Sequence, residues 1–201
     1  MKKEIIALDA DGVLLDYNLA YASAWQQAFG RYPAEKDANA YWAQDRWDVD
    51  RLSGERLDHF RRCFDASFWS NVPAASGALE ACHALVEAGY DLVCVTALPE
   101  KYARARQDNL SQLGFPISKV FATDHTESDR SPKADALQQL RPVAFVDDYL
   151  PYMAGVADDI HLALVTRETN GSPNQGLALG KVGSQHPSLL EFSRWWVQRV
   201  R

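Results

Sequence analysis

The sequence predicts an α/β fold, in which a parallel sheet carries helices on both faces and a small helical subdomain is added. Short apolar runs of strand length alternate with longer segments of helical periodicity. The apolar runs are continuous, as in parallel strands that are buried on both faces. Residues 17–72 break the alternation and contain no obvious parallel strand. The sequence therefore predicts a Rossmann-like core with one helical insertion.

Five apolar runs are predicted as the strands of this sheet. The first two read EIIAL and YDLVCVT, and three later runs have similar length. The predicted strands are 4–8, 90–96, 119–123, 143–147 and 160–166. The stretch 167–187 is rich in turn-forming residues, so we expect it to be irregular.

The segments between and after these strands have helical periodicity. The predicted helices are 76–89, 99–114, 131–140, a short helix at 150–157 and a last helix at 188–200. Gly89 suits the C-terminus of the first helix. Ser131 is predicted as an N-cap and Pro132 as the first helical residue of the third. Ser188 and Glu191 have the spacing of a capping box at the start of the last helix.

The predicted domain organisation is a core of residues 1–16 and 73–201, with residues 17–72 inserted as a helical cap subdomain. The insertion is rich in aromatic and charged side chains. Most of its aromatic residues are interpreted as its own hydrophobic core. A second interpretation stays open for the stretch YWAQDRWDVDR, in which Arg46, Arg51 and the neighbouring rings stack a base or bind a second anionic group.

The composition limits the classes of partner. The formal net charge of −6 argues against nucleic acid or an anionic membrane. No apolar run approaches the length of a membrane span, and the start MKKEIIALDADG does not have the pattern of a signal peptide. The three cysteines and five histidines show no zinc motif. Cys82 and Cys94 lie in apolar patterns and are predicted core thiols, which favours a reduced, cytoplasmic setting.

Polar residues follow the predicted strands at the point where each strand ends. Asp9 and Asp11 come directly after the first strand, and Thr96 ends the second. Asp147 and Asp148 end the fourth. Open α/β sheets bind ligands beyond the carboxyl ends of their strands, so these side chains are expected to gather at one edge. A divalent cation would stabilise such a group of carboxylates, and Mg²⁺ prefers oxygen ligands.

These residue types suit phosphoryl transfer. Asp9 is placed to attack phosphorus and form an acyl phosphate, while the cation cancels repulsion between the carboxylate and an anionic substrate. Asp11 can protonate the leaving oxygen and later deprotonate the hydrolytic water. Thr96 would donate a hydrogen bond to the phosphoryl group, and Lys133 would hold its charge in place.

Each motif taken singly also has a structural interpretation. Asp11-Gly12 between two apolar runs is a hairpin-turn signal, and Thr96 can simply lead into a helix. Lys133 can be a solvated lysine, and the two aspartates after the fourth strand can begin a loop. The occurrence of all four motifs in this order favours the catalytic interpretation.

The four motifs DADGVLLD, VTALP, SPKADAL and FVDDY resemble, in order and spacing, those of the haloacid dehalogenase-like hydrolase superfamily. The resemblance implies that Asp9 is the nucleophile and Asp11 the general acid and base. It implies that Thr96 and Ala97 of the second motif bind the substrate phosphate and that Lys133 stabilises its charge. The inserted helices would be a cap of the kind that this family places after its first motif.

The resemblance also implies a metal site. Mg²⁺ would be held by Asp9, Asp147 and the backbone carbonyl of Asp11. Asp148 would be a further ligand or a partner of Lys133.

Asp11 separates the activities within this family, since the dehalogenases lack a second aspartate at this position and work without metal. The resemblance therefore implies a Mg²⁺-dependent phosphatase with an aspartyl-phosphate intermediate. Val13 stands where the protein-phosphatase branch usually has threonine, which indicates a small phosphorylated metabolite, a sugar phosphate or a nucleotide. Two alternatives stay open: a phosphomutase of the same fold, and a non-catalytic binding module that acts through its cap.

A few residues outside the motifs are predicted, by position alone, to face the site. They are Tyr17, Asn18, Tyr149, Arg167 and Asn170. The carboxy-terminal stretch RWWVQR is interpreted as part of a helix docked on the sheet, and its paired tryptophans are a candidate contact in a homodimer.

Overall fold

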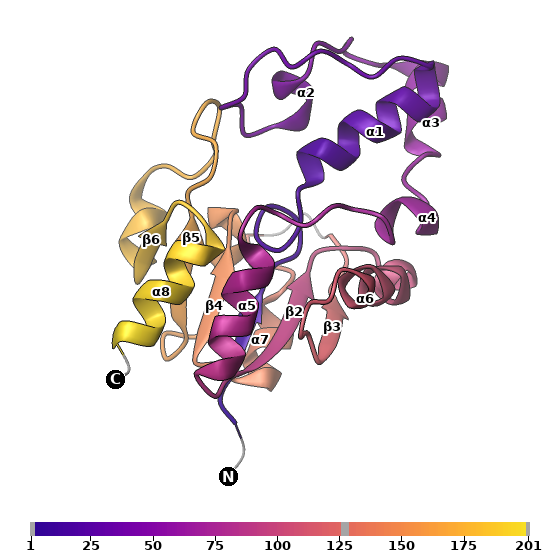
Figure 1. Ribbon diagram of the computed structural model, residues 1–201. Helices are drawn as coiled ribbons and strands as arrows, with labels where there is room; N and C mark the ends of the chain where they lie inside the picture. Colours follow the sequence, from indigo (N-terminus) through magenta and orange to yellow (C-terminus); the bar gives the residue numbers. More distant parts are fainter. Residues whose placement is uncertain (1–2, 126–128, 200–201) are drawn as a thin grey trace.

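The computed structural model describes residues 3–125 and 129–199, which form a six-stranded sheet (Figure 1). The strand order is β3-β2-β1-β4-β5-β6, and every neighbouring pair is parallel. The strands are β1 Ile5–Leu8, β2 Asp91–Thr96, β3 Lys119–Ala122, β4 Ala144–Asp147, β5 His161–Val165 and β6 Ser184–His186. The predicted Rossmann-like α/β fold is confirmed.

Helices cover both faces of the sheet. They are η1 Glu100–Tyr102, α5 Ala78–Glu87, α6 Ala103–Gln112, α7 Ala134–Leu140, η2 Leu150–Met153, η3 Leu177–Lys181 and α8 Leu189–Arg199. Alternate residues of β1 and β2 belong to two separate hydrophobic clusters, because successive side chains of a strand point to opposite faces. Helices α5, α6 and α8 contribute to the first cluster and α7 to the second. None of the described helices combines the length and apolar character needed to cross a membrane.

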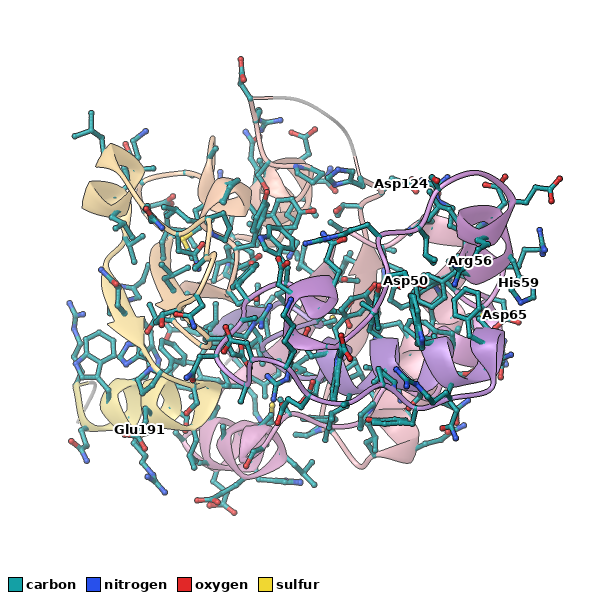
Figure 2. The ribbon with its side chains drawn as sticks, turned by 90° about the horizontal axis from the view of Figure 1, so that it is seen from above. Asp50, Arg56, His59, Asp65, Asp124 and Glu191 are labelled. Atoms are coloured by element: carbon teal, nitrogen blue, oxygen red, sulfur yellow. The ribbon has the colours of Figure 1, made fainter. Side chains whose placement is uncertain are left out.

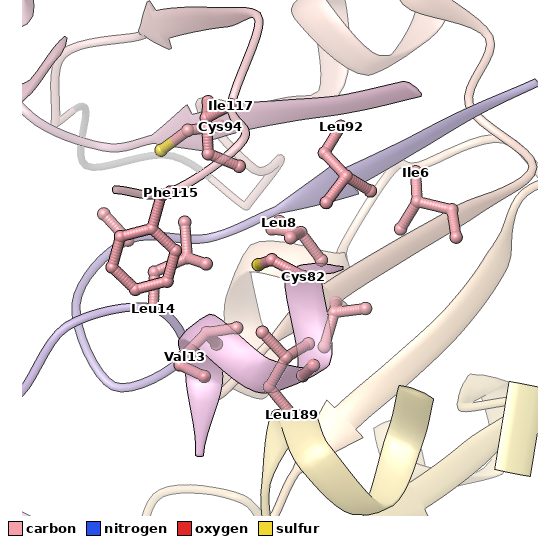
Figure 3. Close-up of a cluster of buried hydrophobic side chains, with 14 of the residues drawn as sticks. Ile6, Leu8, Val13, Leu14, Cys82, Leu92, Cys94, Phe115, Ile117 and Leu189 are labelled. Carbon is pink, nitrogen blue, oxygen red and sulfur yellow. The ribbon is translucent and has the colours of Figure 1, made fainter. Parts of the chain in front are cut away.

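The larger cluster is a closely packed apolar core between the sheet and helices α5 and α8. Leu8, Leu92 and Cys82 are completely buried in it, and Leu189 of α8 packs into the same cluster (Figure 3). Cys94 is also completely buried, which confirms that Cys82 and Cys94 are core thiols. The three cysteines of the chain are free. The cytoplasmic location stays a prediction.

Helix α8 packs beside α5 and against β5 and β6, as the docked helix predicted from RWWVQR. Trp196 is 7% exposed and lies against Tyr90 and Phe192. Ser188 Oγ accepts a hydrogen bond from Glu191 N, at 3.3 Å, as expected for the first turn of this helix. Residue 200, at the end of the predicted helix, lies outside the described residues. The homodimer stays a prediction.

Strand β6 was not predicted, because it lies in the stretch expected to be irregular. Its three residues, Ser184–His186, have no apolar alternation that would mark a strand. They pair with β5, where Val165 lies opposite His186, and Thr166 N donates to His186 O at 2.8 Å. The strand therefore depends on an edge that the rest of the sheet provides.

The predicted start of the helix at 131–140 is wrong. Helix α7 begins at Ala134, and a turn precedes it. Ser131 Oγ accepts a hydrogen bond from Lys133 N at 3.1 Å, and Ala134 N donates to Ser131 O. Ser131 therefore caps a turn rather than the helix. Lys133 occupies the N-cap position, where its side chain can reach the edge of the sheet.

Residues 17–72 lie beyond the carboxyl ends of the strands (Figure 1). We call these residues the helical segment. Their helices are α1 Tyr17–Phe29, α2 Ala43–Arg46, α3 Gly54–Arg61 and α4 Ala66–Trp69. Trp25, Phe60 and Cys63 form a hydrophobic cluster of the segment's own, which supports the interpretation of these aromatic residues as core. The division of the chain into a core, 1–16 and 73–201, and a cap subdomain, 17–72, stays a prediction, and its bounds include residues that the structure does not describe.

The outer surface of the helical segment carries exposed ion pairs. Arg56 and Asp50 are 3.0 Å apart, with both side chains more than half exposed. Seen from above, they lie with His59 at one end of the molecule, and Glu191 of α8 lies at the other (Figure 2). Exposed pairs of this kind contribute little to stability. The fold therefore depends on its apolar core and its buried charges.

Leu85 of α5 is completely buried in the larger cluster. Replacing it with alanine removes apolar contacts and leaves a cavity, so Leu85→Ala should lower the free energy of unfolding by about 2–5 kcal/mol. Leu177 in η3 is completely exposed, and Leu177→Ala should change stability by less than about 0.5 kcal/mol. Urea denaturation of the two variants measures this difference. Equal stabilities would contradict the described packing.

Candidate functional site

The first motif places two carboxylates beyond the end of β1. Asp9 continues the strand by one residue, because its N–H donates to Val146 O of β4 at 2.9 Å. The chain then turns at Gly12, which has a φ of +91°, a left-handed conformation that glycine adopts without a steric penalty. Gly12 N donates to Leu15 O at 2.8 Å and closes the turn. Asp9 is left buried and Asp11 half-buried at the edge of the sheet.

Three carboxylates converge at this edge. Asp9, Asp147 and Asp148 are all buried, and one oxygen of each lies within 4.8 Å of the others. Pairing of β1 with β4, in which Leu8 lies opposite Val146, brings the two motifs together. The structure thus brings the first and fourth motifs to one place.

Lys133 lies between two of these carboxylates. Its side chain is completely buried, and Nζ is 2.5 Å from Asp9 Oδ1 and 2.7 Å from Asp147 Oδ2. Burial by itself lowers the pKa of Lys133, but Asp147 and Asp9 outweigh burial and raise the pKa above its ordinary value. The ammonium group therefore stays charged and balances the nucleophile candidate and its neighbour.

Asp148 pairs with Arg167 and not with Lys133. Arg167 Nε lies 2.6 Å from Asp148 Oδ2, so the alternative in which Asp148 is the partner of Lys133 is not what the structure contains. Burial raises the pKa of Asp148, and Arg167 opposes this shift. A Cβ atom on Gly12 would overlap the Asp148 carboxylate and lie 2.7 Å from Arg167 Nε. The turn therefore needs glycine here for space as well as for φ.

The charges and donor atoms of this cluster fit a divalent cation. Three carboxylates face two cationic side chains, Lys133 and Arg167, so this group keeps a net negative charge. Burial raises the pKa of Asp147 well above its usual value, and Lys133 opposes the rise. A set of carboxylate oxygens is the environment that Mg²⁺ and other hard cations prefer.

Asp11 has a partner of its own, on α6. Arg106 Nη2 lies 2.8 Å from Asp11 Oδ1 and 3.0 Å from Oδ2, and the arginine side chain is completely buried. Trp69 of α4 covers the guanidinium group, with its ring centroid 5.2 Å from Cζ. Burial and the charge of Asp9 raise the pKa of Asp11, and Arg106 lowers it in part. The Asp11 carboxylate therefore stands apart from the three converging ones.

A cavity of about 560 Å³ opens above these groups, a volume typical of sites for small ligands. Five of the predicted site residues line it: Asp9, Asp11, Thr96, Ala97 and Asp148. Lys133 and Asp147 are completely buried and support the cavity floor through Asp9. Thr96 is the last residue of β2 and is itself buried.

Four of the five residues predicted by position also line this cavity. They are Tyr17, Asn18, Tyr149 and Arg167. Asn170 does not, because its Nδ2 donates to Asp37 Oδ2 at 2.9 Å and its backbone pairs with the helical segment. The expectation for Asn170 is therefore wrong.

Arg46 and Arg51 are both committed to ion pairs. Arg46 pairs with Glu35 and Glu168 at 2.9 Å, and Arg51 pairs with Asp45. Neither arginine lines the cavity. The open interpretation in which they bind a second anionic group is not supported.

Sequence reasoning missed Arg106 and three aromatic rings of the cavity wall. The rings belong to Trp69, His125 and Tyr152, whereas Tyr41 and Trp42 lie in the stretch YWAQDRWDVDR, for which stacking on a base was left open. A signal for Arg106 was present, because Arg106, Asn109 and Leu110 have the spacing of one helix face and all three are buried. A cation on the inner face of a helix needs an acidic partner. The rings had no such signal, since they come from separate segments.

Lys133→Met should leave Asp9 and Asp147 buried without their shared cation. Removing one partner from a buried ion pair typically costs about 3–5 kcal/mol, so the free energy of unfolding should fall by that order. Lys101 in η1 is exposed, and Lys101→Met should change stability by less than about 0.5 kcal/mol. Thermal and urea unfolding give both values, and a Lys133→Met protein as stable as Lys101→Met would refute the arrangement.

No family model matches the chain, and no curated protein does so either. Solved structures do match it. A haloacid dehalogenase (HAD) family hydrolase from Deinococcus radiodurans R1, with bound phosphate and sodium, aligns with a TM-score of 0.65 and 18% identity over 98% of this chain and 96% of its own.

The names of two further similar structures describe two different activities. A predicted phosphoglycolate phosphatase from Haemophilus somnus 129PT has a TM-score of 0.60 and 18% identity, and the alignment covers 98% of this chain and 99% of its own. A dehalogenase has a TM-score of 0.62 and 14% identity, with 96% and 97% covered. At these identities the likeness concerns the fold. The chain has the fold of the haloacid dehalogenase-like hydrolases.

Proposed function

We propose that the protein is a Mg²⁺-dependent phosphatase, which hydrolyses a small phosphorylated metabolite of the sugar phosphate or nucleotide class through an aspartyl-phosphate intermediate. The observation that carries this proposal is the placement of Asp9 and Asp11 on one cavity. Asp9 is held by Lys133 at 2.5 Å and Asp11 by Arg106 at 2.8 Å. Two carboxylates with different partners can take different roles in one reaction.

Asp9 is the nucleophile in this proposal. Lys133 occupies its Oδ1, so Oδ2 is the oxygen that would attack phosphorus. A bond then forms between Oδ2 and phosphorus, and the bond from phosphorus to the leaving oxygen breaks. Lys133 also keeps the Asp9 carboxylate in one orientation, which lowers the entropic cost of reaching the attack geometry.

Asp11 is the general acid and then the general base. Its raised pKa favours the protonated form that must donate to the leaving oxygen. In the second step water attacks phosphorus, the bond to Asp9 breaks, and Asp11 takes the proton from that water. Inorganic phosphate and the free Asp9 carboxylate result.

The substrate phosphate would be bound by the second motif. Thr96 and Ala97 line the cavity beside Asp9, where a hydroxyl and a backbone N–H can donate to phosphoryl oxygens. Asp9, Asp147 and Asp148 would hold the cation with the Asp11 carbonyl. When bound, the cation offsets the negative charge of carboxylates and phosphate.

The presence of Asp11 favours phosphate esters over carbon–halogen bonds. An alkoxide leaving group needs a proton, whereas a halide does not. A carboxylate that lines the cavity beside the nucleophile therefore has a use in ester hydrolysis.

Asp9→Asn should reduce hydrolysis of p-nitrophenyl phosphate to the background rate, because an amide cannot act as the nucleophile. EDTA should have the same effect on the unchanged protein, and added Mg²⁺ should restore its activity. Phosphate release measures both. Asp91→Asn, at the opposite end of the sheet, serves as the matched control with full activity. Turnover by Asp9→Asn, or turnover in EDTA, would refute the proposal.

Asp11→Asn should lower kcat/KM, which depends only on the steps up to formation of the aspartyl-phosphate, by about 10²–10⁴-fold for an alkyl phosphate, whose leaving oxygen needs a proton. The loss should be smaller for p-nitrophenyl phosphate, since nitrophenolate leaves without one. Asp16 caps α1, because its side chain accepts a hydrogen bond from Leu19 N. Asp16→Asn therefore makes the same chemical change at a residue outside the cavity, and this variant should keep its kcat/KM. Equal losses of kcat/KM with both esters would exclude Asp11 as the acid.

A further inference from the structure

Aromatic rings surround the cavity above the proposed phosphate site. Six of them come from four separate parts of the chain: Tyr17, Tyr41, Trp42, Trp69, Tyr149 and Tyr152. A cavity of about 560 Å³ is larger than a phosphate group needs. The remaining space belongs to whatever group is attached to the phosphate.

The ring of Trp42 is fixed in place but not covered. Its Nε1 donates to Gly171 O at 3.1 Å, and its ring meets Tyr41 and Tyr149 edge-on at centroid distances of 4.9 and 6.3 Å. Tyr41 is held in turn by its hydroxyl, which donates to Asp148 O at 3.2 Å. Trp42 is nevertheless 42% exposed. A large ring that is held rigidly and left open beside a cavity is a preformed stacking surface.

The charges of the cavity exclude a second anionic group on the substrate. Among the described residues that line it, Arg167 is the only arginine or lysine. Its guanidinium group already forms ion pairs with Asp148 and Glu168. The guanidinium groups of Arg46 and Arg51 form ion pairs with residues outside the cavity. A carboxylate or second phosphate would enter beside Asp9, Asp11 and Asp148 without a cation of its own.

Two polar side chains complete the wall. Asn18 is buried and offers an amide, and His125 accepts from or donates to the Tyr152 hydroxyl at 3.0 Å. An amide and an imidazole can hydrogen-bond the edge of an aromatic heterocycle. Stacking surfaces with a few such groups are how proteins bind a nucleobase.

We propose that this cavity is a subsite for a flat, uncharged aromatic heterocycle, so that the substrate class is a nucleoside 5′-monophosphate. This inference rests on the proposed phosphatase function and selects the nucleotide from the two classes named there. Trp42 stacks on the base, and Tyr149 and Tyr41 support Trp42.

Two phosphate esters with the same leaving oxygen isolate the contribution of the base. Uridine or adenosine 5′-monophosphate and ribose 5-phosphate share the 5′ oxygen as leaving group, and only the nucleotide carries a base. The kcat/KM for the nucleotide should exceed that for ribose 5-phosphate by about tenfold or more, the contribution of one stacked base. Phosphoglycolate, with its carboxylate, should be a worse substrate than either. A kcat/KM for ribose 5-phosphate or phosphoglycolate that equals or exceeds that of the nucleotides would overturn the inference.

Trp42→Leu should reduce the ratio of the two kcat/KM values to near one, and Trp42→Phe, which keeps a ring, should retain an intermediate ratio. Tyr32→Leu is the matched control, because Tyr32 is an aromatic residue of the same segment, 43% exposed and outside the cavity. Its ratio should equal that of the unchanged protein. A ratio that Trp42→Leu leaves unchanged would also overturn the inference.

Failure of the phosphatase proposal can be told apart from failure of this one. Calorimetric titration of the Asp9→Asn variant in Mg²⁺ compares binding of uridine 5′-monophosphate with binding of ribose 5-phosphate, and requires no turnover. Tighter binding of the nucleotide by about tenfold or more, without hydrolysis by the unchanged protein, would support the subsite and refute the phosphatase. Equal affinities would refute the subsite, whatever the activity.

Discussion

One buried ammonium group makes the edge of this sheet possible. Lys133 lies within 2.7 Å of Asp9 and Asp147, which end two adjacent parallel strands. Two carboxylates at this depth repel each other, and the burial of each charge costs several kcal/mol unless a partner offsets it. A lysine at the N-cap position of α7 meets both needs because its ammonium group reaches both carboxylates. Their charges outweigh the positive end of the helix dipole, which by itself disfavours a cation there. The turn that delays α7 until Ala134 allows the side chain to reach the sheet.

A second series of contacts connects the same edge to the helical segment. Asp148 pairs with Arg167, whose guanidinium lies 4.2 Å from the ring centroid of Tyr41. Arg167 also pairs with Glu168, which pairs with Arg46 of α2. The wall of the cavity and the carboxylates at its floor are therefore held by one set of charges. This coupling gives a fixed position to Trp42, the next residue after Tyr41, relative to the proposed nucleophile.

Much of the fold could be predicted because its strands are short, continuous apolar runs that alternate with helical periodicity. Five strands of the described sheet were found in this way, and β6 was not, because Ser184–His186 becomes a strand only by pairing with β5. The convergence of Asp9, Asp147 and Asp148 was also predictable, because the carboxyl ends of parallel strands lie at one edge of the sheet. The partner of Asp148 was not, since Arg167 lies in a stretch of turn-forming residues without a regular pattern. Arg106 had a signal in its helix face, and the rings of Trp69, His125 and Tyr152 had none.

By itself the sequence determined which strands end in carboxylates, and that a lysine lies near the start of the helix after the third strand. These are local properties, set by apolar length and by the alternation of a strand. Only the tertiary structure decided which charge meets which. Lys133 is 124 residues from Asp9, and Arg106 is 95 residues from Asp11. Such pairs depend on packing between elements rather than on periodicity, because a buried charge takes whichever partner the surrounding helices bring within hydrogen-bond reach.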